Sequence, residues 1–324
     1  VTNGFQPLWF LIILVLKFFV NNEIIFNCFI ISLIFIFSFL TFFNFRNYLK
    51  KQNYTETSSI FISVSISFLS LFFSKNGMEI SLAIFLFSRS LIYLNNNNIL
   101  FCIFAFLTFL SRLEFILFYF VIFFYELFIA KKIFQKKYIF QILILPILLI
   151  FYMVFNHFYF DSFLPESGIA KSLNNHLQFN KETFAFLTSQ SLSMKFISSL
   201  FYINMFGLFF LFSKLLNKFT KFALITSLLF FTSNSLRSAW PIWTWHFFFL
   251  SISTPLLIDD LIKSINFSLF KYRTYIICIF FSLAYFSLFI KHYGVNNDHI
   301  LNIAIKISNH YKFDKYERFA MGDM

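Results

Sequence analysis

Charge, glycine and proline are scarce in this chain of 324 residues. Charged side chains make up 12% of it, and it contains only 6 Gly and 5 Pro. So little charge excludes an ordinary soluble domain, in which about 25% of residues are charged, and so few glycines and prolines exclude a low-complexity linker protein. The three cysteines, Cys28, Cys102 and Cys278, lie far apart in apolar runs, so neither a disulfide scaffold nor a zinc site is supported.

Hydrophobic residues fill the space that charge leaves. They account for 59% of the chain, and the mean hydropathy is +0.75. Phe alone contributes 59 residues, but Ile, Asn and Lys are abundant too, and A/T-rich codons encode all four, so we interpret the Phe excess as genome composition. The composition predicts a polytopic membrane protein.

Apolar runs able to cross a bilayer recur along the whole chain. A spanning helix needs about 20 apolar residues, and shorter ones occur inside bundles. We therefore expect an all-α, polytopic transmembrane bundle of about ten spans, in which the two short runs 99 to 111 and 114 to 129 are either separate helices or one long tilted helix. The expected spans are 24 to 45, 57 to 74, 80 to 94, 99 to 111, 114 to 129, 138 to 155, 196 to 213, 222 to 236, 244 to 258 and 274 to 290.

Alternate loops differ in their content of Lys and Arg. One set carries 13 basic residues in 43 positions and the other carries 11 in 92. Short cytoplasmic loops are enriched in basic residues, so the first set is assigned to the inside. The net charge of +12 comes from loops of this kind, so no nucleic-acid partner is expected. The first set comprises the loops 46 to 53, 95 to 98, 130 to 137, 214 to 221 and 259 to 273.

Residues 8 to 20 are too short and too interrupted, by Lys17, for a span, and we expect an interfacial helix on the outer face. The outer face also receives the longer loops, 156 to 195 and 291 to 324. Asp259 and Asp260 fall on the inner side, where we expect them to cap helices or snorkel. The sequence thus places the function at the extracytoplasmic surface.

Six short motifs lie on that outer face. They are NGFQPLW from Asn3, NGME ending at Glu79, SRLE from Ser111 to Glu114, LPESGIAK ending at Lys171, LRSAWPIWTWH from Leu236 to His246, and AMGDM, which contains Asp323. Each is weak alone, and their order, spacing and common sidedness make the signal.

As a set, these motifs resemble bacterial GT-C class polyprenyl-phosphate-dependent glycosyltransferases, most closely the arabinofuranosyltransferase-like branch. The resemblance spans residues 2 to 324 and implies one integral membrane domain over 1 to 324. Because Val1 already lies inside the first motif and the family pattern continues past Met324, it also implies a fragment whose first transmembrane helix, first outer loop and principal catalytic carboxylate precede Val1.

The implied activity is inverting transfer of a sugar from a polyprenyl-phosphate donor to a cell-envelope acceptor at the bacterial inner membrane, with membrane lipid as a further partner. Such transfer needs a base, cations for the phosphate and aromatic surfaces for the sugar. Glu79, at the tip of a short hairpin, is either a solvated turn acid or a catalytic carboxylate that acts as a base or positions the acceptor. The resemblance gives Asp323 a similar catalytic role and Asn3 a place in substrate binding.

Arg112 and Glu114 interrupt a long, nearly uncharged stretch. Arg112 either binds phosphate, because guanidinium does so bidentately, or forms a structural pair with Glu114. In the first case Glu114 orients Arg112. Lys171 is either a solvated loop lysine or a second ligand of the lipid phosphate.

The densest polar and aromatic cluster comprises Arg237, Trp240, Trp243, Trp245 and His246. The tryptophans form either an interfacial anchor belt or a sugar-stacking surface, with Arg237 on the phosphate and Trp243, Trp245 and His246 on the substrate.

Several chemistries have no sequence support. No GxGxxG, P-loop, HExxH or Cys/His cluster occurs, so nucleotide-sugar and ATP-driven mechanisms are not expected. No metal ligands are assigned, and a divalent cation is left open as a cofactor. The alternatives to an enzyme are a polytopic transporter or lipid-linked-sugar flippase, whose ionisable groups should extend through the midplane, and a non-catalytic scaffold.

Overall fold

Helices make up every regular element in the described part of the chain, which confirms the all-α fold class. The chain divides into two units, Val1–Leu269 and Phe270–Met324, and the described residues all belong to the first. The expected span 274 to 290 therefore lies outside them. The computed structural model describes residues 6–74, 79–94, 96–125, 136–161, 163, 184–188, 192–237 and 244–264.

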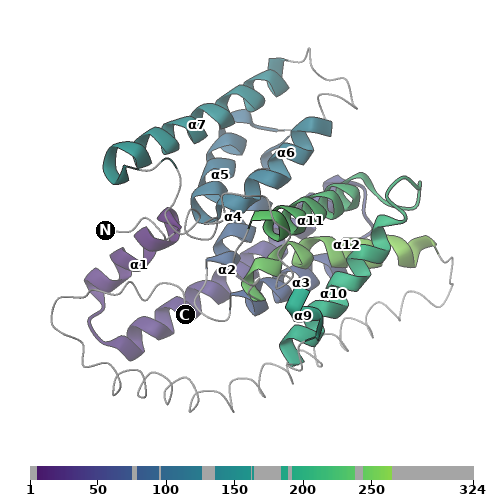
Figure 1. The fold of residues 1–324 in the computed structure, drawn as a ribbon, viewed down its shortest axis with the longest axis horizontal. Coiled ribbons are helices and arrows are strands. Elements are labelled where there is room, and N and C mark those ends of the chain that lie inside the picture. Colours follow the sequence, from purple (N-terminus) through teal and green to yellow (C-terminus); the bar gives the residue numbers. More distant parts are fainter. Residues whose placement is uncertain are drawn as a thin grey trace. The chain divides into compact units, whose positions relative to one another are not determined.

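Figure 1 shows the helices in chain order, and some neighbours are joined by short connections, such as residues 20–22 between the first two helices. Two of them, η1 and η4, are 3-10 helices that continue directly into α-helices. In chain order the elements are α1 (Pro7–Phe19), α2 (Glu23–Lys51), α3 (Glu56–Phe73), α4 (Ile80–Tyr93), α5 (Asn98–Ser111), η1 (Leu113–Phe115), α6 (Ile116–Phe124), α7 (Lys136–Phe160), α9 (Ala185–Thr188), α10 (Leu192–Leu208), α11 (Lys218–Arg237), η4 (Thr244–Phe249) and α12 (Leu250–Ser264).

Polar caps set the helix starts close to those expected. The Asn22 carboxamide accepts from the first-turn N–H groups of α2, at 2.9 and 3.2 Å. The Asn97 side chain does the same for α5, at 3.0 and 3.1 Å, and the Thr55 hydroxyl accepts from Ser58 N–H at the start of α3. These side chains satisfy backbone donors that have no partner inside the helix.

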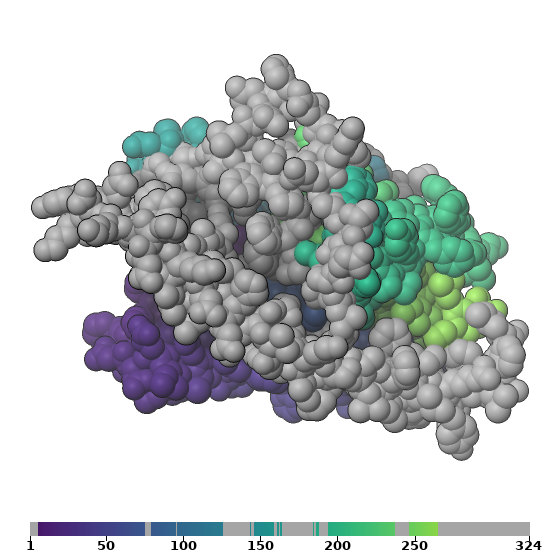
Figure 2. Space-filling view, turned by 60° about the horizontal axis from the view of Figure 1, so that its bottom comes forward, coloured from purple at the N-terminus to yellow at the C-terminus, as the bar shows by residue number. Residues whose placement is uncertain are grey.

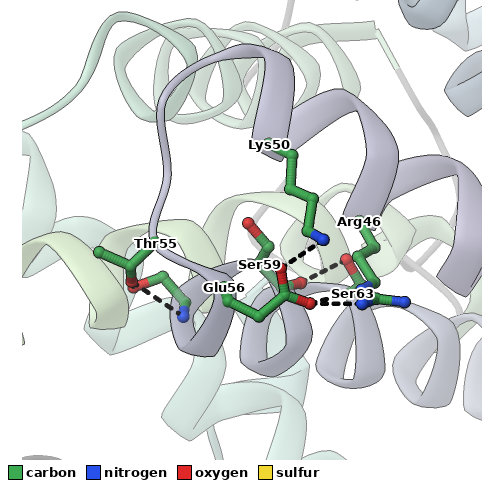
Figure 3. Close-up of polar contacts among 7 residues, drawn as sticks. Arg46, Lys50, Thr55, Glu56, Ser59 and Ser63 are labelled. Carbon is green, nitrogen blue, oxygen red and sulfur yellow. Dashed lines mark hydrogen bonds and ion pairs between the residues drawn. The ribbon is translucent and has the colours of Figure 1, made fainter.

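The basic end of α2 stays helical beyond residue 45, where we expected it to end. Arg46 and Lys50 lie one turn apart and both reach the Glu56 carboxylate in the first turn of α3 (Figure 3). The Arg46 Nε to Glu56 Oε1 distance is 2.9 Å. The positive charges that predict an inner loop therefore belong to a helix end that is tied to the next helix.

Residues 99 to 129 do not form one long helix. The backbone of Arg112 is extended, with φ −160° and ψ 111°, and it ends α5. The chain then turns through η1, and α6 folds back on α5. Two contacts show this return: the Tyr119 hydroxyl hydrogen-bonds Thr108 at 3.3 Å, and Phe101 packs against Phe123. Of the two possibilities left open, the separate helices are observed.

Helix ends gather into two groups, which we call the Arg112 end and the Asp260 end. The start of α4, the end of α5 and η4 meet at Arg112, through Glu79 and Phe248. The end of α12 meets the start of α11 at Asp260. Successive helices from α2 to α6 therefore run in alternating directions, as the loop pattern predicts, and α2 packs against both α3 and α4 (Figure 1).

Asp260 holds the start of α11, so of the two roles expected for it, capping and snorkelling, the contacts correspond to capping. Its carboxylate accepts from Asn217 N–H at 2.7 Å and from the Thr220 hydroxyl at 2.6 Å, and Asn217 Nδ2 is a third donor. Asp259 pairs with Lys263 at 2.6 Å, and the Lys263 ammonium lies 4.4 Å from the centre of the Tyr54 ring. The α2–α3 turn and the ends of α11 and α12 are thereby joined at one end of the bundle.

Small polar side chains line the helix interfaces, and several of them hydrogen-bond one another. Ser38 of α2 meets Ser70 of α3 at 2.8 Å, and Asn44 of α2 donates to Ser88 of α4 at 3.0 Å. Ser90 bonds the Tyr119 hydroxyl at 2.8 Å. Small residues with such bonds are typical of helix contacts in membranes, where they let backbones approach closely.

Large apolar side chains face outward along α2. Ile24, Phe29, Phe35, Phe39 and Phe43 are all at least 40% exposed, while the polar Ser38, Thr41 and Asn44 of the same helix are buried. Figure 2 shows the N-terminal helices, in purple, with part of their surface uncovered by other parts of the molecule. This distribution is the reverse of a helix on a water-soluble protein.

Helix lengths support membrane spanning only in part. Within the described residues, α2 and α3 are the helices long and apolar enough to cross a bilayer, and other apolar stretches run 10 to 17 residues. The bundle of about ten spans is therefore a proposal, which belongs with the proposed function. The expected interfacial segment 8 to 20 is indeed a separate helix, α1, which buries Trp9 and exposes Phe18 and Phe19.

Candidate functional site

Glu79 lies at the start of α4 and points into the protein. Its carbonyl accepts from Ala83 N–H at 2.9 Å, so its backbone belongs to the first helical turn, and the residue is 5% exposed. The buried Ser74 hydroxyl at the end of α3 accepts from Ser81 N–H at 2.8 Å, which ties the two helix ends together. Glu79 is therefore a buried carboxylate, and the solvated turn acid considered for it is ruled out.

Arg112 is equally buried, at 2% exposure, in the break between α5 and η1. Its N–H donates to the Thr108 carbonyl at 2.8 Å, and its own carbonyl accepts from Phe115 N–H at 3.2 Å. Both backbone groups of Arg112 are thus hydrogen-bonded across the break. These bonds fix the backbone from which the guanidinium extends at the α5–α6 turn.

The two buried groups form an ion pair. Arg112 Nη1 donates to Glu79 Oε1 at 2.8 Å, the usual length of a charge-assisted hydrogen bond. The sequence points to each residue separately, but the pairing that it suggests for Arg112 is with Glu114. The strong partner is Glu79, because the turn at Arg112 carries the guanidinium onto the neighbouring hairpin.

Glu114 also faces Arg112, at longer range. Its two carboxylate oxygens lie 3.4 Å from Arg112 Nε and 3.4 Å from Arg112 Nη2. The Glu114 side chain is 28% exposed, against 3% for Arg112. One guanidinium thus lies between a buried, tightly bound carboxylate and a looser, partly exposed one, and the three carry a net negative charge when both carboxylates are ionised.

An aromatic floor supports the cluster. Arg112 Cζ lies 4.7 Å from the centre of the Phe248 ring, a cation–π contact. Phe248 packs in turn against the tilted rings of Phe115 and Phe249, and all three are fully or almost fully buried. Phe248 is not among the residues that the sequence singles out, and the only signal for it is its position two residues after His246.

The Phe248 contact also places η4 beside Arg112. His246, which belongs to η4, is half-buried and has an interaction partner of its own. His246 of the expected Trp/His cluster therefore belongs to a helix that lies at the Arg112 end. The side chains of Arg237 and Trp245 are outside what the structure describes, as are Asn3, Lys171, Trp243 and Asp323 altogether.

The described residues do not form a metal centre. They include no group of three or more His, Cys, Asp or Glu side chains that could hold an ion. Glu79 and Glu114 are two carboxylates near each other, but the Arg112 guanidinium lies between them. This part of the chain therefore offers no site that fits a divalent cation.

Comparisons with protein-family models, curated proteins and solved structures gave no match for this chain. The resemblance to GT-C glycosyltransferases therefore remains a prediction. The contacts of Arg112 with Glu79 and Glu114 are the structural features that bear on its function.

Proposed function

We propose that this chain is a polytopic glycosyltransferase of the bacterial inner membrane, which transfers a sugar from a polyprenyl-phosphate donor to a cell-envelope acceptor. The observation that carries the proposal is the cluster in which Glu79 and Glu114 hold the buried Arg112 at one end of an apolar bundle. A buried guanidinium is costly in such surroundings, and ionisable groups at membrane depth are usually functional.

The exposed face of α2 supports membrane insertion. Apolar side chains are exposed from Ile24 to Phe43, a stretch of 20 positions and so about 30 Å of helix. This length matches the hydrocarbon core of a bilayer. In the expected topology, the Arg112 end then lies at the extracytoplasmic surface and the Asp260 end in the cytoplasm.

The chemistry of the cluster suits a lipid-phosphate donor. A guanidinium matches the oxygens of a phosphate in a two-point contact, and its charge stabilises the phosphate as it leaves the sugar. Arg112 is fixed by Glu79 and Phe248 before any substrate arrives, so it loses little freedom on binding. Lys171 and Arg237 are the further cations that we propose for this phosphate.

Glu79 is a proposed catalytic carboxylate, and its geometry adds a second role. Bound to Arg112 at 2.8 Å, it positions the guanidinium, and it acts on the acceptor hydroxyl only if that bond opens. The two roles predict different kinetics. If Glu79 is a base, the pH–rate profile has an acidic limb, and this limb is lost in Glu79→Gln. If Glu79 only positions Arg112, Glu79→Gln raises the donor KM and leaves the limb in place.

The interior polar contacts favour the enzyme over a transporter. Among the described residues, the buried charged side chains lie at the two helix-end groups, and none lies between them. The polar groups in the interior are neutral and largely paired, as Asn44 is with Ser88 and Asn204 with Thr254, at 2.6 Å. A path for an ionic substrate would place ionisable groups through the midplane.

The test is sugar transfer by membranes that contain the complete gene product. A short-chain polyprenyl phosphate carrying a labelled pentose or hexose is the donor, and a cell-envelope glycan extract is the acceptor. We expect Arg112→Ala and Glu79→Gln to reduce transfer about 100-fold or more, and Arg112→Lys to recover little of it, because a point charge replaces a planar fork.

Glu23→Gln is the matched control, because it removes an exposed carboxylate at the start of α2 and leaves the cluster intact. Each variant is compared at equal amounts of folded protein, measured by size-exclusion chromatography in detergent. Unchanged transfer in Arg112→Ala would disprove the phosphate role. No transfer by the wild-type chain with any donor, together with efflux or flipping of the lipid in vesicles, would instead favour the transporter.

A further inference from the structure

We propose that the edge of Arg112 formed by Nε and Nη2 is the phosphate-binding edge, and that Glu114 occupies it until a phosphate group displaces it. The inference rests on the proposed function in that the phosphate is taken to be that of the lipid donor. It assigns to Glu114 the role of an exchangeable ligand, in place of an orienting residue.

The distances distinguish the two carboxylates. Glu79 bonds Nη1 at 2.8 Å, whereas both contacts of Glu114 are 3.4 Å long. Charge-assisted N–H···O bonds have lengths of about 2.7 to 2.9 Å. Glu114 therefore faces the guanidinium edge on, in the two-point arrangement that a phosphate adopts, but from a distance at which little hydrogen bonding is gained.

The unused atoms are on this edge. Arg112 Nε and Glu114 Oε2 are both buried, and neither has a hydrogen-bond partner among the described residues. A buried donor without a partner is costly, and on a guanidinium it is the position that an anion completes. The group in the cluster that most needs a hydrogen-bond acceptor is therefore the N–H at Arg112 Nε.

Burial shows which carboxylate can leave. The Glu79 side chain is 7% exposed, so releasing it from Arg112 would strand a charge inside the protein. The Glu114 side chain is 28% exposed, and on release it can turn towards water. Phe248, 4.7 Å from the guanidinium carbon, and Glu79 would keep Arg112 in place during the exchange.

The exchange has a direct consequence for affinity. In the wild-type chain, a phosphate must compete with the Glu114 charge. An amide at this position keeps the shape of the side chain and removes the competition. Because partly exposed ion pairs contribute up to about 1 kcal/mol, which is about fivefold in affinity, we expect Glu114→Gln to bind phosphate about fivefold more tightly.

The experiment measures binding without catalysis. The purified full chain in a neutral maltoside detergent is titrated calorimetrically with dodecyl phosphate and, separately, with inorganic phosphate. Glu114→Gln and Glu114→Ser should both bind dodecyl phosphate more tightly than wild type, while Arg112→Lys should bind it more weakly. Glu23→Gln is the charge-matched control and should leave the affinity unchanged.

Two results would overturn the inference. One is an unchanged or weaker affinity in both Glu114 variants, each shown to be folded by its unfolding temperature. The other is an equal gain in Glu23→Gln, which would make the effect one of overall charge. An equal gain for inorganic phosphate supports the inference and assigns the contact to the head group alone, whereas a gain confined to dodecyl phosphate shows that the lipid chain takes part.

The failure of this inference is distinguishable from that of the proposed function. Tighter binding of dodecyl phosphate by Glu114→Gln without sugar transfer by any form of the chain would leave a lipid-phosphate site on a protein that is no glycosyltransferase. Transfer that depends on Arg112, with no gain in phosphate affinity in the Glu114 variants, would leave the enzyme and remove the exchange.

Discussion

Arg112 and Glu79, 33 positions apart in the chain, are joined by a hydrogen bond of 2.8 Å between side chains that are 3% and 7% exposed. The bond connects the end of α5 to the start of α4, two helices that pack along their length. It makes the α3–α4 hairpin and the α5–α6 turn one unit, so the same pair contributes to both the stability of the fold and the geometry of the candidate site.

The pair should be strongly coupled in unfolding. Glu79→Gln leaves a buried guanidinium without its main counter-charge, and we expect it to cost about 3 kcal/mol or more. Glu79→Gln combined with Arg112→Gln should recover much of that loss, because neither charge remains. The measurement is the free energy of unfolding in mixed micelles, arranged as a double-mutant cycle. Glu56→Gln, in the exposed Arg46–Lys50 cluster, is the control, and an effect as large as that of Glu79→Gln would contradict the assignment.

The helix directions can be tested by labelling. In a chain without Cys28, Cys102 and Cys278, single cysteines are introduced at Gln52 and Asp161, which are both exposed. We expect an impermeant thiol reagent to reach Asp161→Cys from the extracytoplasmic side and Gln52→Cys only after the membrane is opened. Labelling of both from one side would disprove the alternating topology.

The outward face of α2 should respond to charge as a lipid-facing surface does. Phe39 is 64% exposed, and a Lys at the centre of a spanning helix costs about 2.5 to 3.5 kcal/mol on insertion. Phe39→Lys should therefore reduce the membrane-integrated fraction, measured by carbonate extraction, and Phe39→Leu should not. Equal integration of both variants would show that this face does not contact lipid.

The contact between α10 and α12 depends on a glycine. A Cβ on Gly207 would overlap the buried Leu257 side chain, with Cδ1 at 3.0 Å and Cδ2 closer still. Gly207→Ala should therefore destabilise the chain, although alanine favours an isolated helix by about 1 kcal/mol. Leu257→Ala in the same chain should relieve the overlap, and thermal unfolding of the two single variants and the double variant tests this. If Gly207→Ala raises the unfolding temperature, the close contact is not present.

Asp260 should make stability depend on pH. It lies beyond the expected span 244 to 258, and burial raises its pKa above the ordinary value of 3.8, against the opposing effect of the hydrogen bonds from Thr220 and Asn217. The folded state thus holds the proton more tightly than the unfolded state, so the contribution of Asp260 to stability rises as the pH falls through the folded pKa towards 3.8.

Asp260→Asn removes this titration, and it also costs the cap one acceptor oxygen. We expect the variant to be less stable than wild type, by a margin that grows on acidification from neutral pH towards pH 4. Unfolding temperatures measured for the two proteins across that range give the margin directly. A margin that shrinks on acidification would mean that the carboxylate is stabilised in its ionised form.

The sequence by itself determined the helical class and the approximate positions of most helices in the described part of the chain. Long apolar runs can satisfy their backbone groups only as helices in apolar surroundings, and the expected starts at residues 24, 57 and 99 each lie one residue from the observed starts. It also singled out Glu79 and Arg112, because isolated charges in apolar sequence are conspicuous.

Tertiary structure alone decided how these charges are paired. Nothing in the spacing of Glu79, Arg112 and Glu114 indicates that the bond across 33 positions is short and the contact across two is long. That order follows from the extended backbone at Arg112, which turns the guanidinium towards the adjacent hairpin and onto Phe248. Side-chain partners in a helical bundle depend on helix rotation and on where each turn ends, and these are set by packing among all the helices, which a local pattern does not encode.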